Sequence, residues 1–249
     1  MMPTTETRSA IKSIASYALL ALVLCLFGCA TGPNANPRDP LEPLNRSVSS
    51  FNDGVDKAVL KPVATAYHDV VPSPVRTGVY NFFGNIKDAW SFINSVLQLR
   101  PALAIDNGVR VAMNTFFGLG GLIDVAGAFG IERQSQDFGQ TLGRWGVPTG
   151  PYIVLPLLGP SSVRDTASVL VYSKGDPVWK LKDIRERNSL YLLRTVDLRA
   201  RLLGAGDLLD QIALDKYTFT RDAYLQSRDA EIYRGKGKSG DDGPDDPEK

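Results

Sequence analysis

The sequence predicts a mainly helical protein, and three observations lead to that prediction. Apolar residues recur at spacings of three and four over residues 44–59 and 86–97, the pattern of amphipathic helices. A helix-capping residue stands directly before proline at Asp39-Pro40 and at Ser73-Pro74, which is typical of helix starts. No segment of useful length alternates polar and apolar residues with a period of two, so an extended sheet is not expected.

The first helix is expected to begin at Asp39-Pro40-Leu41-Glu42. This segment has a capping aspartate, a proline at the first helical position and a glutamate at the third. The apolar stripe that follows consists of Leu44, Val48, Phe51, Val55 and Val59. The opposite face carries Asn45, Ser49, Asn52, Asp53 and Asp56.

Two further helices are expected before residue 118. After the start at Ser73-Pro74, a new amphipathic helix is predicted beyond Gly84-Asn85. One side of it carries Ile86, Ala89, Trp90, Ile93 and Leu97, and the other carries Lys87, Ser91, Asn94, Ser95 and Gln98. Pro101 opens another helical segment that runs through Phe117.

Two apolar stretches interrupt the helical pattern, at residues 114–130 and 150–160. The first is dense in glycine, with Asp124 in its middle, and the second is divided by prolines, so neither can form a membrane-spanning helix. Two interpretations remain open. The stretches form loops in a core under the helices, or they dip into a bilayer without crossing it, with protein or water satisfying their backbone.

Residues 178–203 are expected to form one long helix, and residues 207–233 a last helical region. The apolar stripe of the long helix is interrupted by Arg185, Asn188 and Arg199. A kink or ordinary salt bridges would explain these residues. The alternative is that they face a wet internal passage.

The N-terminal 28 residues are expected to be an export signal. Arg8 and Lys12 precede an apolar run, Ile14 to Phe27, that is too short to span a bilayer but suits a signal peptide. The run ends in Leu26-Phe27-Gly28-Cys29, which resembles the lipobox in which cysteine receives lipid after cleavage. An ordinary secretory signal followed by a chance cysteine is the alternative. No aspartate follows the cysteine, which by analogy favours the outer membrane.

Charge and residue inventory argue against several classes of function. The chain has 28 basic and 27 acidic side chains, and removal of Glu6, Arg8 and Lys12 with the signal leaves it formally neutral. Nucleic-acid binding is therefore not expected. The one histidine, His68, is expected at a helix end, and the chain has no nucleophile elbow, zinc-ligand set or nucleotide loop. Ser162 is expected to be a helix cap. We predict neither an enzyme nor a bound cofactor or metal.

Short motifs in a fixed order, taken together, resemble the MlaA (VacJ) family of outer-membrane lipoproteins. They begin with Asp39-Pro40-Leu41-Glu42 and Asn45-Arg46, and the central one is Asn114-Thr115 followed by residues 118–127. The others are Lys61-Pro62-Val63-Ala64, Val71-Pro72 with Val75-Arg76, Asn81-Phe82 with Gly84-Asn85, residues 137–143, Gly150-Pro151-Tyr152, Leu155-Pro156, Gly159, Arg164-Asp165, Asp215, Tyr217, Arg221 and Tyr224. The chain departs from the pattern at Asp53-Gly54, at Lys216, where proline is common, and in its acidic tail.

The resemblance implies a single ring-like, doughnut-shaped helical domain embedded in one leaflet of the membrane. It implies that the protein lies in the inner leaflet of the outer membrane, at the periplasmic face and beside a trimeric porin. Misplaced phospholipid would leave the outer leaflet through an amphipathic channel and pass to a soluble periplasmic carrier. An adaptor lipoprotein that only docks on a porin is the main alternative, and a periplasmic phospholipase that uses His68 is a third.

The chain is accordingly divided into four parts: a signal peptide, residues 1–28; a lipidated tether, 29–38; a helical domain, 39–233; and a disordered acidic tail, 234–249. Cys29 is the expected lipidation site. A loop beside the channel is expected to include Gly118, Gly120, Gly121, Asp124 and Gly127. The candidate channel-lining residues are Asn52, Lys87 and Asn94. Substituting Gly120 or Gly121 with a bulky β-branched residue is expected to disturb lipid asymmetry and leave folding intact.

Overall fold

The computed structural model describes residues 36–233. The predicted signal peptide, Cys29 and the acidic tail lie outside the described residues, so the predictions made for them stay predictions. Within the described range, no helix combines the length and the apolar character needed to cross a membrane.

The fold is mainly helical, as predicted. Its first half contains α2 (Glu42–Val55), a π-helical turn η1 (Asp56–Leu60), α3 (Lys61–Val70), α4 (Ser73–Leu97), α5 (Pro101–Phe116) and the short α6 (Val125–Ala128). The second half contains α7 (Phe138–Arg144), β1 (Tyr152–Leu155), β2 (Gly159–Ser162), α8 (Val163–Gly175), α9 (Ile184–Arg201), α10 (Leu203–Ile212) and α11 (Lys216–Tyr233).

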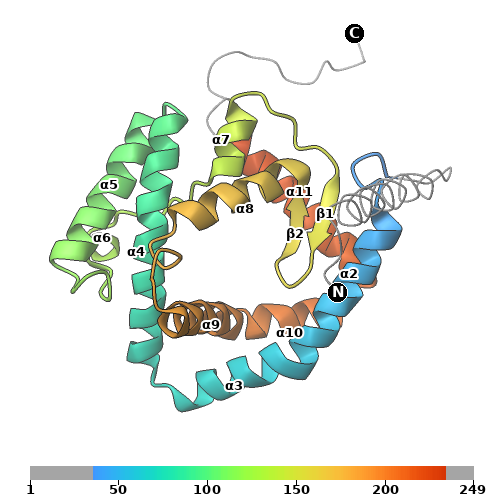
Figure 1. Cartoon of the computed structure of the whole chain (residues 1–249), viewed down its shortest axis with the longest axis horizontal. Helices are drawn as coiled ribbons and strands as arrows, with labels where there is room; N and C mark the ends of the chain where they lie inside the picture. The colour runs from blue at the N-terminus through green and yellow to red at the C-terminus, as the bar shows by residue number, and fades with distance from the viewer. Residues whose placement is uncertain (1–35, 234–249) are drawn as a thin grey trace, which may run out of the picture.

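The helices pack both with their neighbours in sequence and with partners that are distant in sequence. Helix α4 packs along α5 and also meets α9, while α3 lies along α9, and α7 contacts both α8 and α11. Figure 1 shows α4, α8, the β1–β2 hairpin, α10 and α9 placed in turn around the middle of the view, with α5 and α6 outside α4. This placement leaves α5 and the loop after it at the edge of the molecule.

The amphipathic helices bury their polar faces and expose their apolar ones. In α4, Asp88, Ser91 and Asn94 are fully buried, whereas Ile93 and Val96 are exposed. In α2, Asn45 is buried and its amide bridges Asp39 and the Tyr152 carbonyl oxygen, while Phe51 is exposed over 55% of its surface. A large apolar surface facing outward is unusual for a protein surrounded only by water.

Asp39 does not cap the first helix, which corrects the predicted role. Helix α2 has no side-chain cap, and Asp39 is instead buried. Its carboxylate accepts hydrogen bonds from the Asn45 amide (2.8 Å), the Tyr217 hydroxyl (2.5 Å) and the Arg221 guanidinium (3.1 Å). The residue therefore joins the start of the fold to α11 rather than stabilising its own helix end.

The predicted boundary at Gly84-Asn85 is wrong, because α4 runs through it without a break. A Cβ atom on Gly84 would lie 2.5 Å from the Arg133 guanidinium carbon, so this glycine makes room for an arginine and does not end a helix. The predicted start at Ser73-Pro74 is confirmed, but Ser73 does not cap the helix, since the N-cap residue is Pro72 and no side chain caps α4. The helix opened by Pro101 is also confirmed.

The stretch at 150–160, for which a core loop and a segment dipping into a bilayer were the two interpretations, forms most of a β-hairpin. Its strands are antiparallel, with Tyr152 opposite Ser162 and Leu155 opposite Gly159. Tyr152 and Val154 pack into a small core with Tyr217 and Leu225. Ser162 caps α8 by accepting a hydrogen bond from the Asp165 amide, as predicted.

The long helix expected over residues 178–203 is shorter, and it begins at Ile184. Asp183 caps it by accepting hydrogen bonds from the Arg185 and Glu186 amides. The helical region expected over 207–233 is confirmed and consists of two helices, α10 and α11. Arg199 forms a two-bonded ion pair with Asp56, so the salt-bridge explanation holds for this residue.

Candidate functional site

The loop between α5 and α6, residues 117–124, is anchored by a buried arginine. Arg110 has no exposed surface, and it donates to both carboxylate oxygens of Asp124 (3.0 Å each) and to Asp88 (3.0 Å). A fourth hydrogen bond reaches the Ile131 carbonyl oxygen, which follows α6. One side chain of α5 therefore holds both ends of the segment that contains α6.

Asp124 is the second anchor of this loop. It caps α6 by accepting a hydrogen bond from the Gly127 amide, and Asn114 donates to the same carboxylate. Partial burial acts to raise the pKa of Asp124, but the Gly127, Arg110 and Asn114 hydrogen bonds outweigh it and hold the pKa below its ordinary value. The carboxylate is thus kept charged, and the predicted loop residue acts as a fastening point.

Arg110 and Asp88 were missed by the sequence analysis. Asp88 is fully buried and also pairs with Arg133 at 3.0 Å. Asp88 directly follows Lys87, a residue of the predicted polar face, but was not itself singled out. The pattern that could have indicated the buried pair is a polar stripe on each of the two helices, α4 and α5, that pack together.

Three of the predicted loop glycines occupy positions where a side chain would meet its neighbours. A Cβ on Gly118 would lie 2.2 Å from the Ile123 carbonyl oxygen, and one on Gly127 would lie 2.7 Å from Asp124. Gly121 has φ +99° and would place its Cβ 2.7 Å from Asn85. Gly120 has φ +71° but faces open space.

Most large apolar side chains of this segment lie outside a core, although Ala126 is fully buried, so the core-loop interpretation of residues 114–130 does not hold for them. Phe116, Phe117 and Leu119 are exposed over 81%, 76% and 71% of their surfaces. Leu122, Ile123 and Phe129 are also exposed. The loop thus has a rigid polar base and an apolar outer surface.

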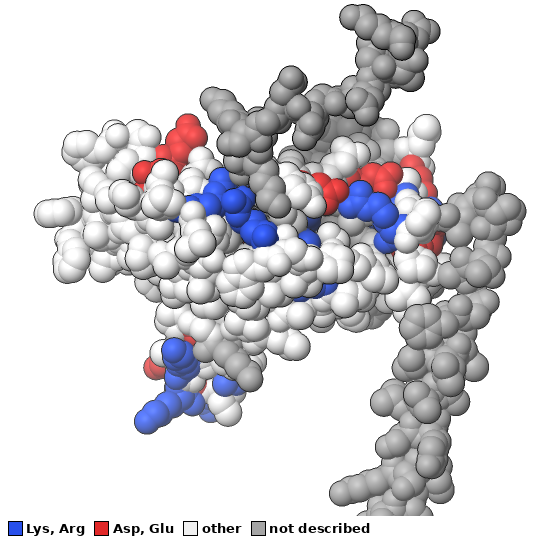
Figure 2. Space-filling model, turned by 90° about the horizontal axis from the view of Figure 1, so that it is seen from above, with Lys and Arg blue, Asp and Glu red and all other residues white. Residues whose placement is uncertain are grey.

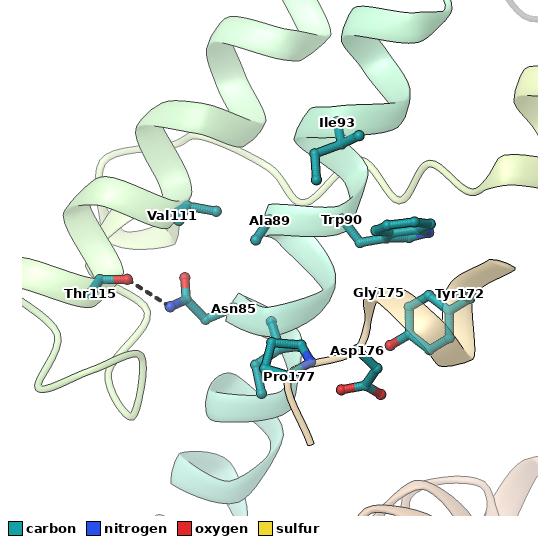
Figure 3. A pocket seen from close by; sticks show the side chains of 11 residues that line it. Asn85, Ala89, Trp90, Ile93, Val111, Thr115, Tyr172, Gly175, Asp176 and Pro177 are labelled. Carbon is teal, nitrogen blue, oxygen red and sulfur yellow. Dashed lines mark hydrogen bonds between the residues drawn. The ribbon is translucent and has the colours of Figure 1, made fainter. Parts of the chain in front are cut away.

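A cavity of about 330 Å³ lies behind the loop, between α4, α5 and the end of α8 (Figure 3). Trp90, Ile93, Val111 and Tyr172 give it mainly apolar walls. The Asn85 amide, which Gly121 contacts, donates to the Thr115 hydroxyl at 2.9 Å at one side of it. The loop and the cavity therefore share a wall.

A second cavity, of about 320 Å³, lies on the other side of Trp90 and Tyr172, whose rings pack edge to face. Its walls are more polar and include Lys87, Arg194 and Asp165. Burial acts to raise the pKa of Asp165, but the hydrogen bond and charge of Arg228 outweigh it and lower the pKa. The two cavities together offer apolar and charged surfaces next to each other.

The three candidate channel-lining residues lie in different surroundings. Lys87 is exposed and lines the second cavity. Asn94 is fully buried and accepts a hydrogen bond from the Thr141 hydroxyl of α7 at 2.8 Å. Asn52 donates to the Leu155 carbonyl oxygen and accepts from the Leu157 amide, which holds the turn of the hairpin.

The histidine and possible metal ligands are the remaining candidates for a chemical site in the described range. His68 lies near the end of α3, exposed and 3.0 Å from Asp69. No group of three or more histidine, cysteine, aspartate or glutamate side chains within residues 36–233 could hold a metal ion. Figure 2 shows charged residues gathered in the upper part of the view and on a projection below, with a largely uncharged surface between them.

Comparison with known proteins assigns the fold to one family. The family described as MlaA lipoprotein matches residues 37–231. "Intermembrane phospholipid transport system lipoprotein MlaA" of Escherichia coli is 37% identical over 210 residues, covering 82% of this chain and 83% of the relative. The protein of the same name in Haemophilus influenzae is 35% identical, covering 90% and 92%.

A solved structure supports the same assignment. It comes from work described as "Structural basis for maintenance of bacterial outer membrane lipid asymmetry". The two structures superpose with a TM-score of 0.69 at 35% sequence identity, over 78% of this chain and 98% of the other. Sequence and structure agree, and the chain belongs to the MlaA lipoprotein family.

Proposed function

We propose that this protein is the lipoprotein component of an intermembrane phospholipid transport system. In this role it takes misplaced phospholipid from the outer leaflet of the outer membrane and passes it to a soluble periplasmic carrier, which maintains lipid asymmetry. The names of the Escherichia coli and Haemophilus influenzae relatives support the transport role. The protein itself acts passively and not as an enzyme.

The proposal rests on the helices that bury their polar faces and expose their apolar faces. Outward apolar side chains on α2, α4 and the loop after α5 suit the acyl region of one leaflet, and buried polar faces suit a hydrophilic interior. The elements placed around the middle of Figure 1 then form a ring, with the passage at its centre. Cys29 carries the lipid anchor, and a trimeric porin lies beside the ring.

The energetics of lipid explain why both kinds of surface are needed. Exposing two acyl chains of about 16 carbons to water would cost more than about 20 kcal/mol, at roughly 0.8 kcal/mol per methylene. The headgroup must keep polar partners during the same step. The cavities on the two sides of Trp90 and Tyr172 supply one surface of each kind.

A transfer assay tests the proposal. The full-length lipoprotein, reconstituted in vesicles that contain a fluorescent phospholipid, should accelerate transfer of that lipid to the purified carrier. Lys87→Glu reverses the one charge that faces the second cavity from α4 and should slow the transfer. Lys180→Glu, on an exposed residue outside both cavities, is the matched control.

Three outcomes would contradict the proposal. Transfer at the same rate with and without the protein would favour the adaptor that only docks on a porin. Release of fatty acid or lysolipid that depends on His68 would identify a phospholipase. Loss of membrane association when Cys29 is removed from an exported variant would contradict an embedded ring, since the apolar surface alone should keep it there.

A further inference from the structure

A third cavity, of about 780 Å³, lies where the end of α3 and the start of α4 face the junction of α9 and α10. This corner is at the lower left of Figure 1. The cavity is lined by His68, Arg76, Tyr80, Arg201, Leu202 and Leu203, and none of these residues lines the two cavities beside Trp90. It is therefore a separate site.

Arg76 is the unusual residue of this cavity. No carboxylate within residues 36–233 forms an ion pair with it, and its Nε atom is buried without a hydrogen-bond partner. Its charge also lies in the first turn of α4, where the helix dipole disfavours a cation. A buried donor without a partner is costly and calls for an explanation.

Two carboxylates at this corner of the fold, Asp197 and Asp69, have partners other than Arg76. Asp197 accepts hydrogen bonds from the Tyr67 hydroxyl (3.0 Å) and Arg201 Nε (3.1 Å). Asp69 lies 3.0 Å from the imidazole of His68. An anion from outside the chain would give Arg76 the partner that the protein does not provide.

Arg201 is held in place at the same cavity. Its guanidinium lies over the Tyr80 ring, 4.0 Å from the centroid, and donates to the Arg76 carbonyl oxygen at 2.7 Å. A fixed guanidinium loses little conformational freedom on binding, and its geometry matches phosphate oxygens. Two arginines therefore converge from α4 and α9.

Apolar side chains line the cavity beside the arginines and the other polar groups. Leu202 and Leu203 form one wall, and Val70 and Val75, at the α3–α4 corner, are exposed over 79% and 54% of their surfaces. A small inorganic anion would leave these surfaces without a partner. A phosphodiester that carries hydrocarbon would contact both kinds of surface.

We propose that this cavity binds the phosphate of a phospholipid headgroup, with Arg76 and Arg201 as its ligands and the leucines against the first part of an acyl chain. The inference rests on the proposed transport function and adds a headgroup site away from the central passage. Phospholipid would rest there on its way to or from the ring.

A local reporter can test the site. The chain has two cysteines, Cys25 in the predicted signal and Cys29 at the predicted lipid anchor, so Ala205→Cys introduces a single thiol that can be labelled with an environment-sensitive dye. Ala205 is exposed and directly follows Gly204, which lines the cavity. The labelled full-length protein, in nonionic detergent, is titrated with short-chain phosphatidylglycerol, with diacylglycerol and with inorganic phosphate.

Gly204→Glu is the decisive variant. A Cβ at this position meets no atom within 4 Å, and an acidic residue near the start of α10 favours the helix. The new carboxylate should weaken phosphatidylglycerol binding about tenfold, whereas Gly204→Gln should leave it close to the original value. Arg76→Ala should also lose about tenfold in affinity, and Arg185→Ala, which removes a charge from an exposed residue of α9 outside this cavity, should not.

Equal affinity in Gly204→Glu and Gly204→Gln would overturn the proposal. So would diacylglycerol that binds as tightly as phosphatidylglycerol, because the phosphate would then have no role. If inorganic phosphate binds with the same affinity as phosphatidylglycerol, the cavity is a phosphate site that does not recognise lipid, and the proposal is overturned as well. The transport assay is independent: an intact site with no transfer would refute the proposed function alone.

Discussion

Replacing Gly121 with valine should destabilise the loop between α5 and α6 more than replacing Gly120, although the two glycines are neighbours. Both have positive φ, +99° and +71°. A β-branched residue in that region costs about 1–2 kcal/mol at either position. The positions differ in their neighbours, since a Cβ at Gly120 meets nothing within 4 Å and one at Gly121 would lie 2.7 Å from the Asn85 Cβ.

The additional cost at Gly121 follows from what must move. Asn85 is buried and its amide donates to the Thr115 hydroxyl at 2.9 Å. Displacing it removes a hydrogen bond worth about 1 kcal/mol and adds overpacking of about 1–3 kcal/mol. Gly121→Val should therefore cost about 3–6 kcal/mol and Gly120→Val about 1–2 kcal/mol. Sequence alone predicts an intact fold for both, but the contacts restrict that expectation to Gly120.

Thermal unfolding of the two purified variants in the same detergent measures the difference. At about 2–4 °C per kcal/mol for a domain of this size, Gly121→Val should melt at least about 4 °C below Gly120→Val. The same melting temperature for both would refute the reasoning from Asn85. If Gly120→Val keeps its stability and also normal outer-leaflet phospholipid in cells, the loop has no influence on transport.

Three further predictions concern pH, charge and membrane binding. Arg228 lowers the pKa of Asp165 in the folded protein, so the stabilising effect of this carboxylate is present above its unfolded pKa of about 3.9. This stabilisation is lost as the pH falls through the folded pKa, and the free energy of unfolding measured against pH should show the loss. The Asp165→Asn variant should show a smaller loss of stability over the same pH range. Asp53 and Lys216, two departures from the family pattern, form an ion pair at 3.1 Å, with both side chains more than a third exposed. A double-mutant cycle should give a coupling free energy of about 0.2–1 kcal/mol. A value near zero would show that the two residues do not compensate each other. Phe117→Asp, at a side chain that is 76% exposed, should leave the melting temperature within about 2 °C of wild type but reduce vesicle binding, and unchanged binding would place Phe117 outside the membrane contact.

The sequence predicts where the amphipathic stripes lie but not which way they face. The apolar stripes that contain Phe51 in α2 and Ile93 in α4 have the same spacing whether they face a protein core or a lipid, because a core and a lipid are both apolar. Only the packing of α4 on α5 shows that the polar side is buried. Asn94, a candidate channel-lining residue, accepts a hydrogen bond from Thr141 of α7, and its predicted role stays a prediction.

The site was predictable in part. Asp124 was named among the residues of the loop, but no partner was predicted for it. Its partner Arg110 lies on α5 and was not identified, because one sequence gives no pairing information across helices. The hairpin at 152–162 was missed because its strands are four residues long and its prolines argue against regular structure.

The bonds of Asp39 also affect the order in which the chain can fold. Tyr217 and Arg221 lie 178 and 182 residues further along the chain, so a polypeptide that emerges N-terminus first presents Asp39 long before its partners exist. Contacts of such high sequence separation form late and slowly. The fold therefore cannot close until α11 has emerged, and a chain that remains open until its last helix arrives stays extended enough to be threaded across a membrane before it folds.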